Sequence, residues 1–572
     1  MNFLWLVTFL TPLFAALLLF ALPGHRHLII ACMWINCAPA LLLAMWPPPD
    51  LLLQQIWPGA GLGGSDMMTR VWLGFTALLW GAAGVAASNE LRNDERQLSF
   101  WLFWLLALSG NMLLIIAQDA LSFYVGFSVM SLSAYGLIIH HKGSRARRAG
   151  RLYMQLAIIA EVLLLTGIII RTFTAGGSAA FADWNATAAD PVTVLLLLTG
   201  LGLKAGFWPL HMWLPLAHPV APAPASAVLS GAMIKAGILG LWRFLPGGDP
   251  LLQSWSQSLL IIGLISAFYA VAVGLFSSRA KEALAYSSVS QMGYMLIIIA
   301  LYWNDAAREP ALALLLVLYA THHALCKGAL FLGAGIASRA GKSSRVDRLF
   351  WFILAIPAVA LAGLPLTNGA AVKILLKDSF KYMNEWSVLL SLGTLATTLL
   401  LLRAWFLMRQ SALKQTALEQ TALKQTALKQ TALGQLRFRD LLPMTLLALL
   451  ALLLPLLWPD LRALSLANLT VAHLAEAIWP VLVAGLLAAV MLYTKRSISL
   501  RLVLPDPLRF SLWLRRILMR PPLPQLDINI DMRKWRPFER RWNRFWQGET
   551  VRRSTLMLIV FLLAAGLTLS FT

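Results

Sequence analysis

Apolar runs long enough to cross a lipid bilayer recur along this chain from one end to the other. A hydrocarbon core about 30 Å thick needs about 20 apolar residues in a helix. Of the 572 residues, 59% are hydrophobic and 13% are charged, which is about half the charge content of an ordinary soluble domain. We therefore expect an all-α polytopic membrane protein. The runs lack the period of two of membrane β-strands, which excludes a transmembrane barrel.

The runs predict about sixteen transmembrane helices. They cover residues 3–22, 27–46, 69–88, 99–117, 120–139, 152–171, 192–208, 222–244, 257–276, 284–301, 311–335, 349–376, 386–407, 440–458, 473–493 and 555–571. No basic region precedes the first run and no small-residue cleavage site follows it, so we expect a retained helix and no signal peptide.

The distribution of positive charge predicts the orientation. The chain has 47 Lys and Arg against 25 Asp and Glu, a net charge of +22. Most of these basic residues lie in the loops after odd-numbered runs, such as 140–151 and 338–348, whereas 47–66 and 174–190 have none. Because loops rich in Lys and Arg stay in the cytoplasm, both termini are predicted on the periplasmic side of a bacterial inner membrane. No basic segment has a nucleic-acid reading element, so nucleic acid is not an expected partner.

Two segments differ from the rest of the chain. Residues 411–435 repeat a five-residue unit (SALKQ-TALEQ-TALKQ-TALKQ-TALGQ). Five residues advance a helix by about 140° beyond one turn, so the Leu side chains form no single stripe. We expect a cytoplasmic loop over 409–439 that has no chemistry of its own and is at most transiently helical. Residues 494–554 are basic and rich in Arg and Trp. This segment is expected to lie at the headgroups, to dock on a neighbouring subunit, or to form a solvated loop.

The most informative residues are ionisable groups inside apolar runs, where each costs about 2.5–3.5 kcal/mol to insert at the bilayer centre. They are Glu161, Lys204, Lys235, Lys327 and Lys373. One lysine alone is explained by snorkelling or by a structural ion pair, but four in four different runs indicate a proton relay. His323 shares a helix face with Lys327 four residues later, and imidazole titrates near neutrality. His218 and His322 are either structural histidines or further members of the relay.

Two apolar runs contain helix-breaking residues. Span 7 runs into GFWPLHMWLP at 206–215, and span 12 contains GLPLTNG at 363–369. Gly and Pro at membrane depth free backbone groups that need a hydrated cavity or protein packing. Lys204 precedes the first break and Lys373 follows the second, which predicts an inverted repeat of spans 4–8 and 9–13.

The chain has little of its own for redox chemistry. Three cysteines, Cys32, Cys37 and Cys326, are too few for an iron–sulfur cluster or an all-thiolate zinc site. No nucleotide-binding loop, metal-ligand cluster or dinucleotide fingerprint is present. We therefore expect no cofactor, no metal and no catalytic residue, and the energy for transport must come from partner proteins.

Four strings carry a specific resemblance. They are GLGLKAGFWPLHMWLPLAHPVAPAPASAVLSGAMIKAG, KEALAYSSVSQMGYM, HHALCKGALFLGAG and GLPLTNGAAVK. In this order they resemble the antiporter-like membrane subunits of the complex I superfamily, over roughly residues 99–408. This superfamily includes respiratory complex I, group 4 membrane-bound hydrogenases and multi-subunit sodium/proton antiporters. The first string looks most like the large membrane subunit of the hydrogenase-4 and formate hydrogenlyase type.

The resemblance implies a fourteen-helix core around a water-filled axis. Helices 1–3 would occupy 1–98, the two inverted five-helix repeats 99–244 and 257–408 with broken helices 7 and 12, helices 14–15 residues 440–493, and a last helix 555–572.

By motif, the resemblance also assigns roles to individual residues. Lys204 matches the lysine of the first broken helix, and Lys235 matches that of the helix after it. Lys327 matches the lysine that links the two halves, with His323 in the same H-x-x-x-K turn. Lys373 matches the terminal charge on the second broken helix. Lys281 matches a less central lysine on the cytoplasmic side.

There is one departure from the family pattern. The family carries a glutamate on span 5, as ion-pair partner of the broken-helix lysine, where YVGFSVMSLSAY has Ser128. Ser128 lies 12 residues from His140 and Glu161 lies 10 residues from Arg151, which gives similar depths of about 18 Å and about 15 Å on adjacent helices. Our hypothesis is that Glu161 has become the partner of Lys204.

The sequence therefore predicts a proton-translocating subunit of a redox-driven complex, related to complex I or to group 4 hydrogenases. Such a subunit belongs to an oxidoreductase complex but has no redox centre. Its partners would be other subunits and the lipid bilayer. Three alternatives remain: a subunit of a sodium/proton antiporter, a subunit of an inorganic-carbon uptake complex, and a membrane anchor that does not pump.

Overall fold

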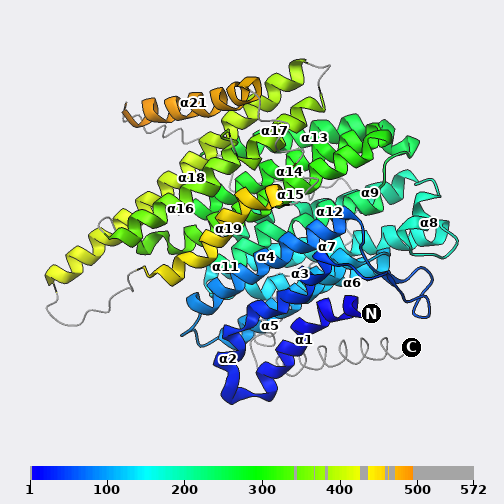
Figure 1. The fold of residues 1–572 in the computed structure, drawn as a ribbon, viewed down its shortest axis with the longest axis horizontal. Coiled ribbons are helices and arrows are strands. Elements are labelled where there is room, and N and C mark those ends of the chain that lie inside the picture. The colour runs from blue at the N-terminus through cyan, green and yellow to red at the C-terminus, as the bar shows by residue number, and fades with distance from the viewer. Residues whose placement is uncertain are drawn as a thin grey trace, which may run out of the picture. The chain divides into compact units, whose positions relative to one another are not determined.

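The computed structural model describes residues 3–340, 344–365, 367–380, 384–425, 436–457, 462 and 471–493. Figure 1 shows that these residues are almost entirely helical, as the apolar runs predict. A short antiparallel hairpin, β1 (Leu51–Leu52) and β2 (Gly61–Leu62), lies inside a stretch predicted as a loop, with Leu51 opposite Leu62. The predicted basic segment 494–554 and the predicted span 555–571 lie outside the described residues.

The α-helices follow one another along the chain with short connections. They are α1 (Leu4–Ala21), α2 (Arg26–Ala31), α3 (Ala38–Met45), α4 (Met67–Glu90), α5 (Gln97–Ile116), α6 (Ala120–Ile138), α7 (Ser144–Thr174), α8 (Phe181–Asn185), α9 (Pro191–Ala205), α10 (Trp213–Ala217), α11 (Ala223–Val228), α12 (Lys235–Phe244), α13 (Pro250–Gly274), α14 (Ala280–Asn304), α15 (Glu309–Ile336), α16 (Arg345–Ala362), α17 (Asn368–Asp378), α18 (Asn384–Gln425), α19 (Phe438–Leu457) and α21 (Val471–Tyr493).

Ten helical segments of the described chain are long and apolar enough to cross a membrane, so this is a multi-pass membrane protein. The predicted span at 27–46 is instead a pair of helical segments, Pro23–Ala31 and Met33–Met45, bent by 60°. Counting this pair as one span gives eleven. The count of about sixteen stays a prediction.

The centre of the fold is formed by helices that are shielded from lipid. The segments Ala223–Phe244 and Ala280–Asn304 are completely buried over their apolar windows, and Ala306–Arg339 nearly so. In Figure 1, α14 and α15 run through the middle of the helical array; α14 packs on α13, and α15 packs on α4, α11 and α19. These central helices carry many of the polar residues of the chain, which fits the rule that polar groups in membrane proteins face the protein interior.

Two pairs of neighbouring helices pack with their backbones in contact through glycines. A Cβ atom added to Gly126 of α6 would lie 2.7 Å from the carbonyl oxygen of Gly110 in α5. One added to Gly293 of α14 would lie 2.5 Å from the carbonyl oxygen of Gly263 in α13. Small residues allow such close approach where apolar lipid gives helices no hydrophobic drive to associate.

Helical structure is interrupted at the two sites where the sequence has Gly and Pro. Helix α9 ends at Ala205 and is followed by Gly206 with φ +68°, and α16 ends at Ala362 and is followed by Gly363 with φ +88°. Glycine tolerates this left-handed conformation, which ends a helix. A wide π-turn, Leu229–Met233, separates α11 from α12 directly before Lys235.

Helix α18 extends farther than the sequence predicts. It continues through Gln425, so the first part of the five-residue repeat is helical where we expected a loop from residue 409. Ala, Leu, Lys and Gln are strong helix formers, and this intrinsic propensity outweighs the missing apolar stripe. Residues 426–435 of the repeat lie outside the described residues.

Candidate functional site

Lys204 occupies the last turn of α9 and is buried. Its ammonium group donates hydrogen bonds to the hydroxyl of Ser131 (2.9 Å) on α6 and to the hydroxyl of Tyr153 (3.2 Å) on α7. It also lies 5.7 Å from the ring centres of Phe127 and Tyr153. A cavity of about 10 Å³, room for about one water molecule, is lined by these side chains.

Glu161 lies on α7 and is buried near this lysine. Its charge is within electrostatic range of Lys204, but the two described side chains form no ion pair, and Oε1 of Glu161 has no hydrogen-bond partner. The structure therefore brings Glu161 into the surroundings of Lys204 without direct contact. Ser128, the residue at the family's glutamate position, has a buried hydroxyl that is also without a hydrogen-bond partner.

Lys235 and His323 are in direct contact at the centre of the fold. The Lys235 ammonium lies 2.9 Å from Nδ1 of His323, 2.8 Å from the carbonyl oxygen of Gly231 and 3.2 Å from that of Ser230. These three acceptors match the three N–H donors of an ammonium group. The site can thus hold a charged lysine with no carboxylate beside it. Nε2 of His323 is buried and has no partner.

Hydrogen bonds lead from Lys327 toward the surroundings of Lys235. Its ammonium donates to the carbonyl oxygen of Leu284 (2.7 Å) on α14. The hydroxyl of Ser288 donates to the same oxygen (3.2 Å) and lies 2.7 Å from the hydroxyl of Ser230. The carbonyl of Ser230 in turn accepts a hydrogen bond from Lys235. These contacts place polar groups between the two lysines. They do not form a continuous hydrogen-bonded path, because the Ser230 hydroxyl and the Ser230 carbonyl belong to different contacts.

Lys373, on α17, lies at the second helix interruption. Its ammonium donates to the carbonyl oxygen of Ala362, the last residue of α16 (2.7 Å). The charge of Lys373 is within electrostatic range of His322, which directly precedes His323 on α15. No direct hydrogen bond links Lys373 to the described histidines. His322 is therefore the residue between Lys373 and the hydrogen-bonded pair of Lys235 and His323.

His218 follows the first interruption in the chain, directly after α10, and Lys281 contacts the segment just beyond it. His218 is fully buried, stacks on Phe331 with ring centres 4.5 Å apart, and has no partner for either ring nitrogen. The charges of Lys281 and Lys327 both act on this ring. Lys281 donates to the carbonyl oxygen of Ala221 (2.9 Å).

Several buried polar atoms on the central helices have no protein partner. They are Oγ of Ser287, Oγ of Ser290, Oγ1 of Thr321 and Nε2 of His323, all on α14 and α15. Buried polar groups are nearly always hydrogen-bonded, to protein or to ordered water. These atoms are available to bind water along the track that the lysines define.

The hydroxyls that contact or connect these lysines were not found from the sequence. Ser131, Tyr153, Ser230 and Ser288 stand in apolar runs in which a hydroxyl is inexpensive. For Ser131 and Ser288, a signal is the density of serine in the strings SVMSLSAY and AYSSVS; Tyr153 and Ser230 lie outside them. Their partners are distant in sequence, by 73 residues for Ser131 and Lys204.

A second polar cluster lies in turns outside the membrane-spanning helices. The carboxylate of Asp94 contacts Nε2 of His140 at 3.1 Å. Burial lowers the pKa of the His140 imidazole, and Asp94 opposes this shift in part. Burial acts to raise the pKa of Asp94, but the Arg96 N–H and the charge of His140 outweigh it and leave that pKa below its usual value. Among the described residues, Asp94, His140 and His141 are the group with the spacing of metal ligands.

Comparison with known proteins identifies the family of this chain. Residues 117–400 match the family described as NADH:quinone oxidoreductase/Mrp antiporter, transmembrane. The chain is an antiporter-like membrane protein of the complex I superfamily. Relatives include hydrogenase-4 component B of Escherichia coli, 32% identical over 50% of this chain and 43% of that protein. NADH-quinone oxidoreductase subunit N of Desulforudis audaxviator is 30% identical over 57% of this chain and 66% of that protein.

An antiporter subunit and a solved antiporter-type structure are also similar to this chain. A putative antiporter subunit mnhA2 of Staphylococcus epidermidis is 28% identical over 54% of this chain and 43% of that protein. This chain thus spans about half the length of these curated relatives. The Mrp complex from Dietzia sp. has a chain with the same fold, with a TM-score of 0.66 at 20% identity, covering 83% of this antiporter-like chain and 99% of that one.

Proposed function

We propose that this antiporter-like chain moves protons through the membrane along a track of buried lysines, histidines and hydroxyls. The observation that carries the proposal is the hydrogen bond between Lys235 and His323. An ammonium that donates to a neutral imidazole can pass its proton along that bond. Since both groups are fully buried, the transfer is protected from bulk water. Lys327 shares the Leu284 carbonyl with Ser288, and because a carbonyl carries no proton, water must complete the step between Lys327 and the central pair.

The ends of the proposed track are Lys204 and Lys373. Lys204 lies against two hydroxyls, each of which both donates and accepts hydrogen bonds and so can relay a proton. Lys373 lies at the interruption between α16 and α17, where backbone groups freed from the helix can face water. In this proposal α5–α12 and α13–α18 are the two halves of an inverted repeat. The interruption after α9 in the first half corresponds to the interruption between α16 and α17 in the second. The glycine contacts at equivalent places, α5 with α6 and α13 with α14, support that assignment.

We further propose that the energy comes from partner subunits, as the names of the relatives suggest. Hydrogenase-4 and NADH-quinone oxidoreductase are redox complexes. The matched region of this chain would then be a subunit of such a complex in a bacterial inner membrane, with both termini on the periplasmic side. The antiporter relatives support the second candidate, a subunit of a sodium/proton antiporter complex.

The substitution His323→Gln tests the relay. A glutamine carbonyl can still accept a hydrogen bond from Lys235, but it cannot carry a proton at neutral pH. We expect the complex to assemble normally and proton uptake into inverted membrane vesicles, followed by a fluorescent pH probe, to fall at least tenfold. The exposed Lys414→Ala is the matched control and should pump at the normal rate. Normal proton uptake by His323→Gln would overturn the relay, and loss of assembly alone would favour a structural anchor.

A further inference from the structure

The two turns at one end of α4–α7 bring three metal-ligand side chains together. Asp94 lies in the turn between α4 and α5, and His140 and His141 lie in the turn between α6 and α7. One donor atom from each of the three lies within 4.8 Å of the other two. These turns belong to the side that the positive-inside pattern predicts to be cytoplasmic.

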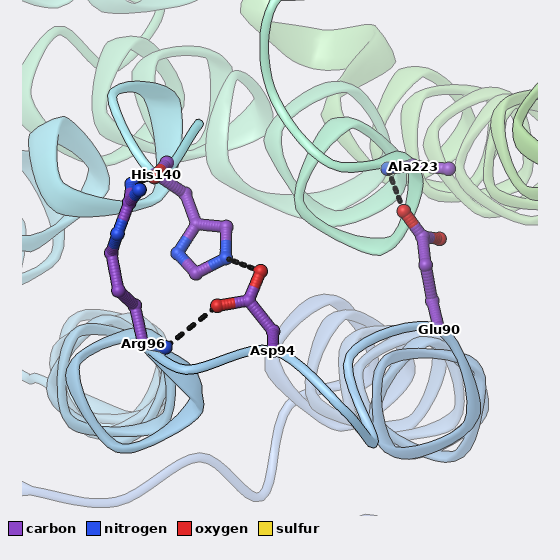
Figure 2. A network of polar contacts seen from close by, with 5 residues as sticks. All are labelled: Glu90, Asp94, Arg96, His140 and Ala223. Atoms are coloured by element: carbon purple, nitrogen blue, oxygen red, sulfur yellow. Dashed lines mark hydrogen bonds and ion pairs between the residues drawn. The ribbon is translucent and has the colours of Figure 1, made fainter. Parts of the chain in front are cut away.

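Two of the three side chains are already oriented by other contacts. Figure 2 shows the Asp94 carboxylate between the His140 ring and the backbone of Arg96, whose N–H donates to Oδ1 of Asp94 at 2.7 Å. The Arg96 guanidinium donates to the His140 carbonyl oxygen at 2.8 Å, which fixes one turn to the other. The His140 ring packs edge-on against Phe100. Such outer contacts orient ligands in natural metal sites.

The distances suit a small tetrahedral ion. Zinc binds His nitrogen and carboxylate oxygen at about 2.0–2.2 Å, which separates neighbouring ligand atoms by about 3.3 Å. Asp94 Oδ2 and His140 Nε2 are 3.1 Å apart, close to this separation. They hydrogen-bond to each other, so a bound ion replaces the proton between them and both groups turn toward the ion. His141 is exposed and can rotate to close the remaining distance. Two imidazoles and one carboxylate favour zinc and its neighbours over calcium or magnesium, which prefer oxygen ligands.

We propose that Asp94, His140 and His141 form a binding site for a divalent transition-metal ion such as zinc, with a fourth position open to water. Nearby acidic and basic residues set the local charge. Glu90 and Asp94 act electrostatically on His141 and favour a cation, whereas Lys281 and Arg96 oppose it. The carboxylate and the two imidazoles determine which metal ion binds. The nearby acidic and basic side chains determine how tightly it binds.

A metal ion bound at this site should slow proton uptake, an expectation that rests on the proposed proton transport. Glu90 accepts a hydrogen bond from the backbone of Ala223, and Lys281 donates to Ala221, so both hold the short segment that follows His218. A bound metal adds positive charge beside this segment. It therefore disfavours the arrival of a further positive charge at His218, a candidate member of the relay that lies directly before this segment. Where His218 takes part in the proposed transport, bound metal should slow proton uptake.

Metal binding is tested on the full-length protein purified without a polyhistidine tag. After removal of metal with a chelator, cobalt(II) is titrated and followed by its visible absorption, which is strong only for tetrahedral coordination. We expect one equivalent to bind, and affinity to fall at least tenfold in Asp94→Asn and in His141→Ala. His141 is exposed, so its removal leaves the packing of the fold intact. Two exposed histidines at the start of α2, in His25→Ala and His27→Ala, serve as matched controls and should bind like the unchanged protein.

The outcomes separate the site from its consequence. Equal cobalt affinity in the unchanged protein, Asp94→Asn and His141→Ala would overturn the site. Zinc should slow proton uptake in vesicles by several-fold in the unchanged protein and not in His141→Ala. Tight binding without any slowing would remove the regulatory consequence and leave the site. The transport proposal itself is judged separately, by His323→Gln without added metal.

Discussion

The buried lysines of this protein differ in what surrounds their ammonium groups. Lys235 has three acceptors, Lys204 has two hydroxyls, and Lys327 and Lys373 each donate to one backbone carbonyl. A buried charge is stable only when its hydrogen bonds are satisfied. Of the four, Lys235 therefore has the most complete set of hydrogen-bond acceptors around its ammonium group.

The Tyr153 hydroxyl supports Lys204 in two ways, since it accepts from the lysine and donates to the carbonyl oxygen of Ser131 at 2.8 Å. In Tyr153→Phe we expect proton uptake to fall by about tenfold, which corresponds to the loss of about one hydrogen bond to a charged group. Assembly should be unchanged, because the ring still packs on Trp213. The half-buried Tyr124 of α6 is a suitable control, and an equal loss in Tyr124→Phe would contradict the prediction.

Glu161 should act on Lys204 at a distance. Because no ion pair joins them, we expect Glu161→Gln to slow proton uptake without abolishing it. The double variant Glu161→Gln with Ser128→Glu returns a carboxylate to the position where the family carries one, and it should restore part of the lost rate. The rates in vesicles are compared at equal protein. Uptake at the normal rate in Glu161→Gln alone would remove Glu161 from the track.

Residue chemistry explains which parts of the site the sequence could predict. A lysine inside an apolar run costs free energy to insert into the membrane, so its presence there needs a reason. For this reason the sequence could single out four lysines: Lys204, Lys235, Lys327 and Lys373. A serine in a helix carries no such cost, so Ser131 and Ser288 could not be singled out. Counting residues from the helix ends predicts that Glu161 and Ser128 lie at similar depth in the membrane. It does not predict which face of the helix either residue lies on. For this reason it could not predict that the carboxylate stops short of contact.

At the scale of elements, close backbone contact fixes the packing of α13 on α14. In Gly293→Ala the added Cβ would lie 2.5 Å from a backbone oxygen, so the two helices must separate. We expect a loss of about 1–3 kcal/mol, the usual cost of overpacking, seen as a lower thermal unfolding midpoint in detergent. Gly485→Ala on α21 has nothing within 4 Å and should leave the midpoint unchanged or slightly raised. Equal midpoints for the two variants would contradict this account of the packing.

Element boundaries show where local signals succeed and where they fail. Gly206 and Gly363 could be read as helix ends, because few residues other than glycine adopt the left-handed conformation. The repeat beginning at Ser411 was expected to be a loop because its leucines form no stripe, yet α18 continues to Gln425. Periodicity predicts which face of a helix is buried. It does not decide whether a segment of good helix formers, continuous with a transmembrane helix, remains helical.

For the whole molecule, the residues of the proposed track lead us to predict transport of protons and not of sodium. Sodium needs a cage of oxygen ligands, whereas ammonium groups along the route repel a metal cation and bind a proton covalently. Replacing sodium with choline should therefore leave the driven transport rate unchanged, as measured by a pH probe in vesicles. A rate that falls when sodium is withdrawn would favour the antiporter alternative.

The wide π-turn Leu229–Met233, just before Lys235, explains how this lysine can be charged while it is buried. The ammonium of Lys235 donates to two carbonyls of this turn, Ser230 and Gly231, so the helix solvates the charge of its own side chain. An acidic counter-ion would bind the proton there too tightly for onward movement. Peptide dipoles stabilise the cation without neutralising it, which is the property that the proposed proton track requires of Lys235.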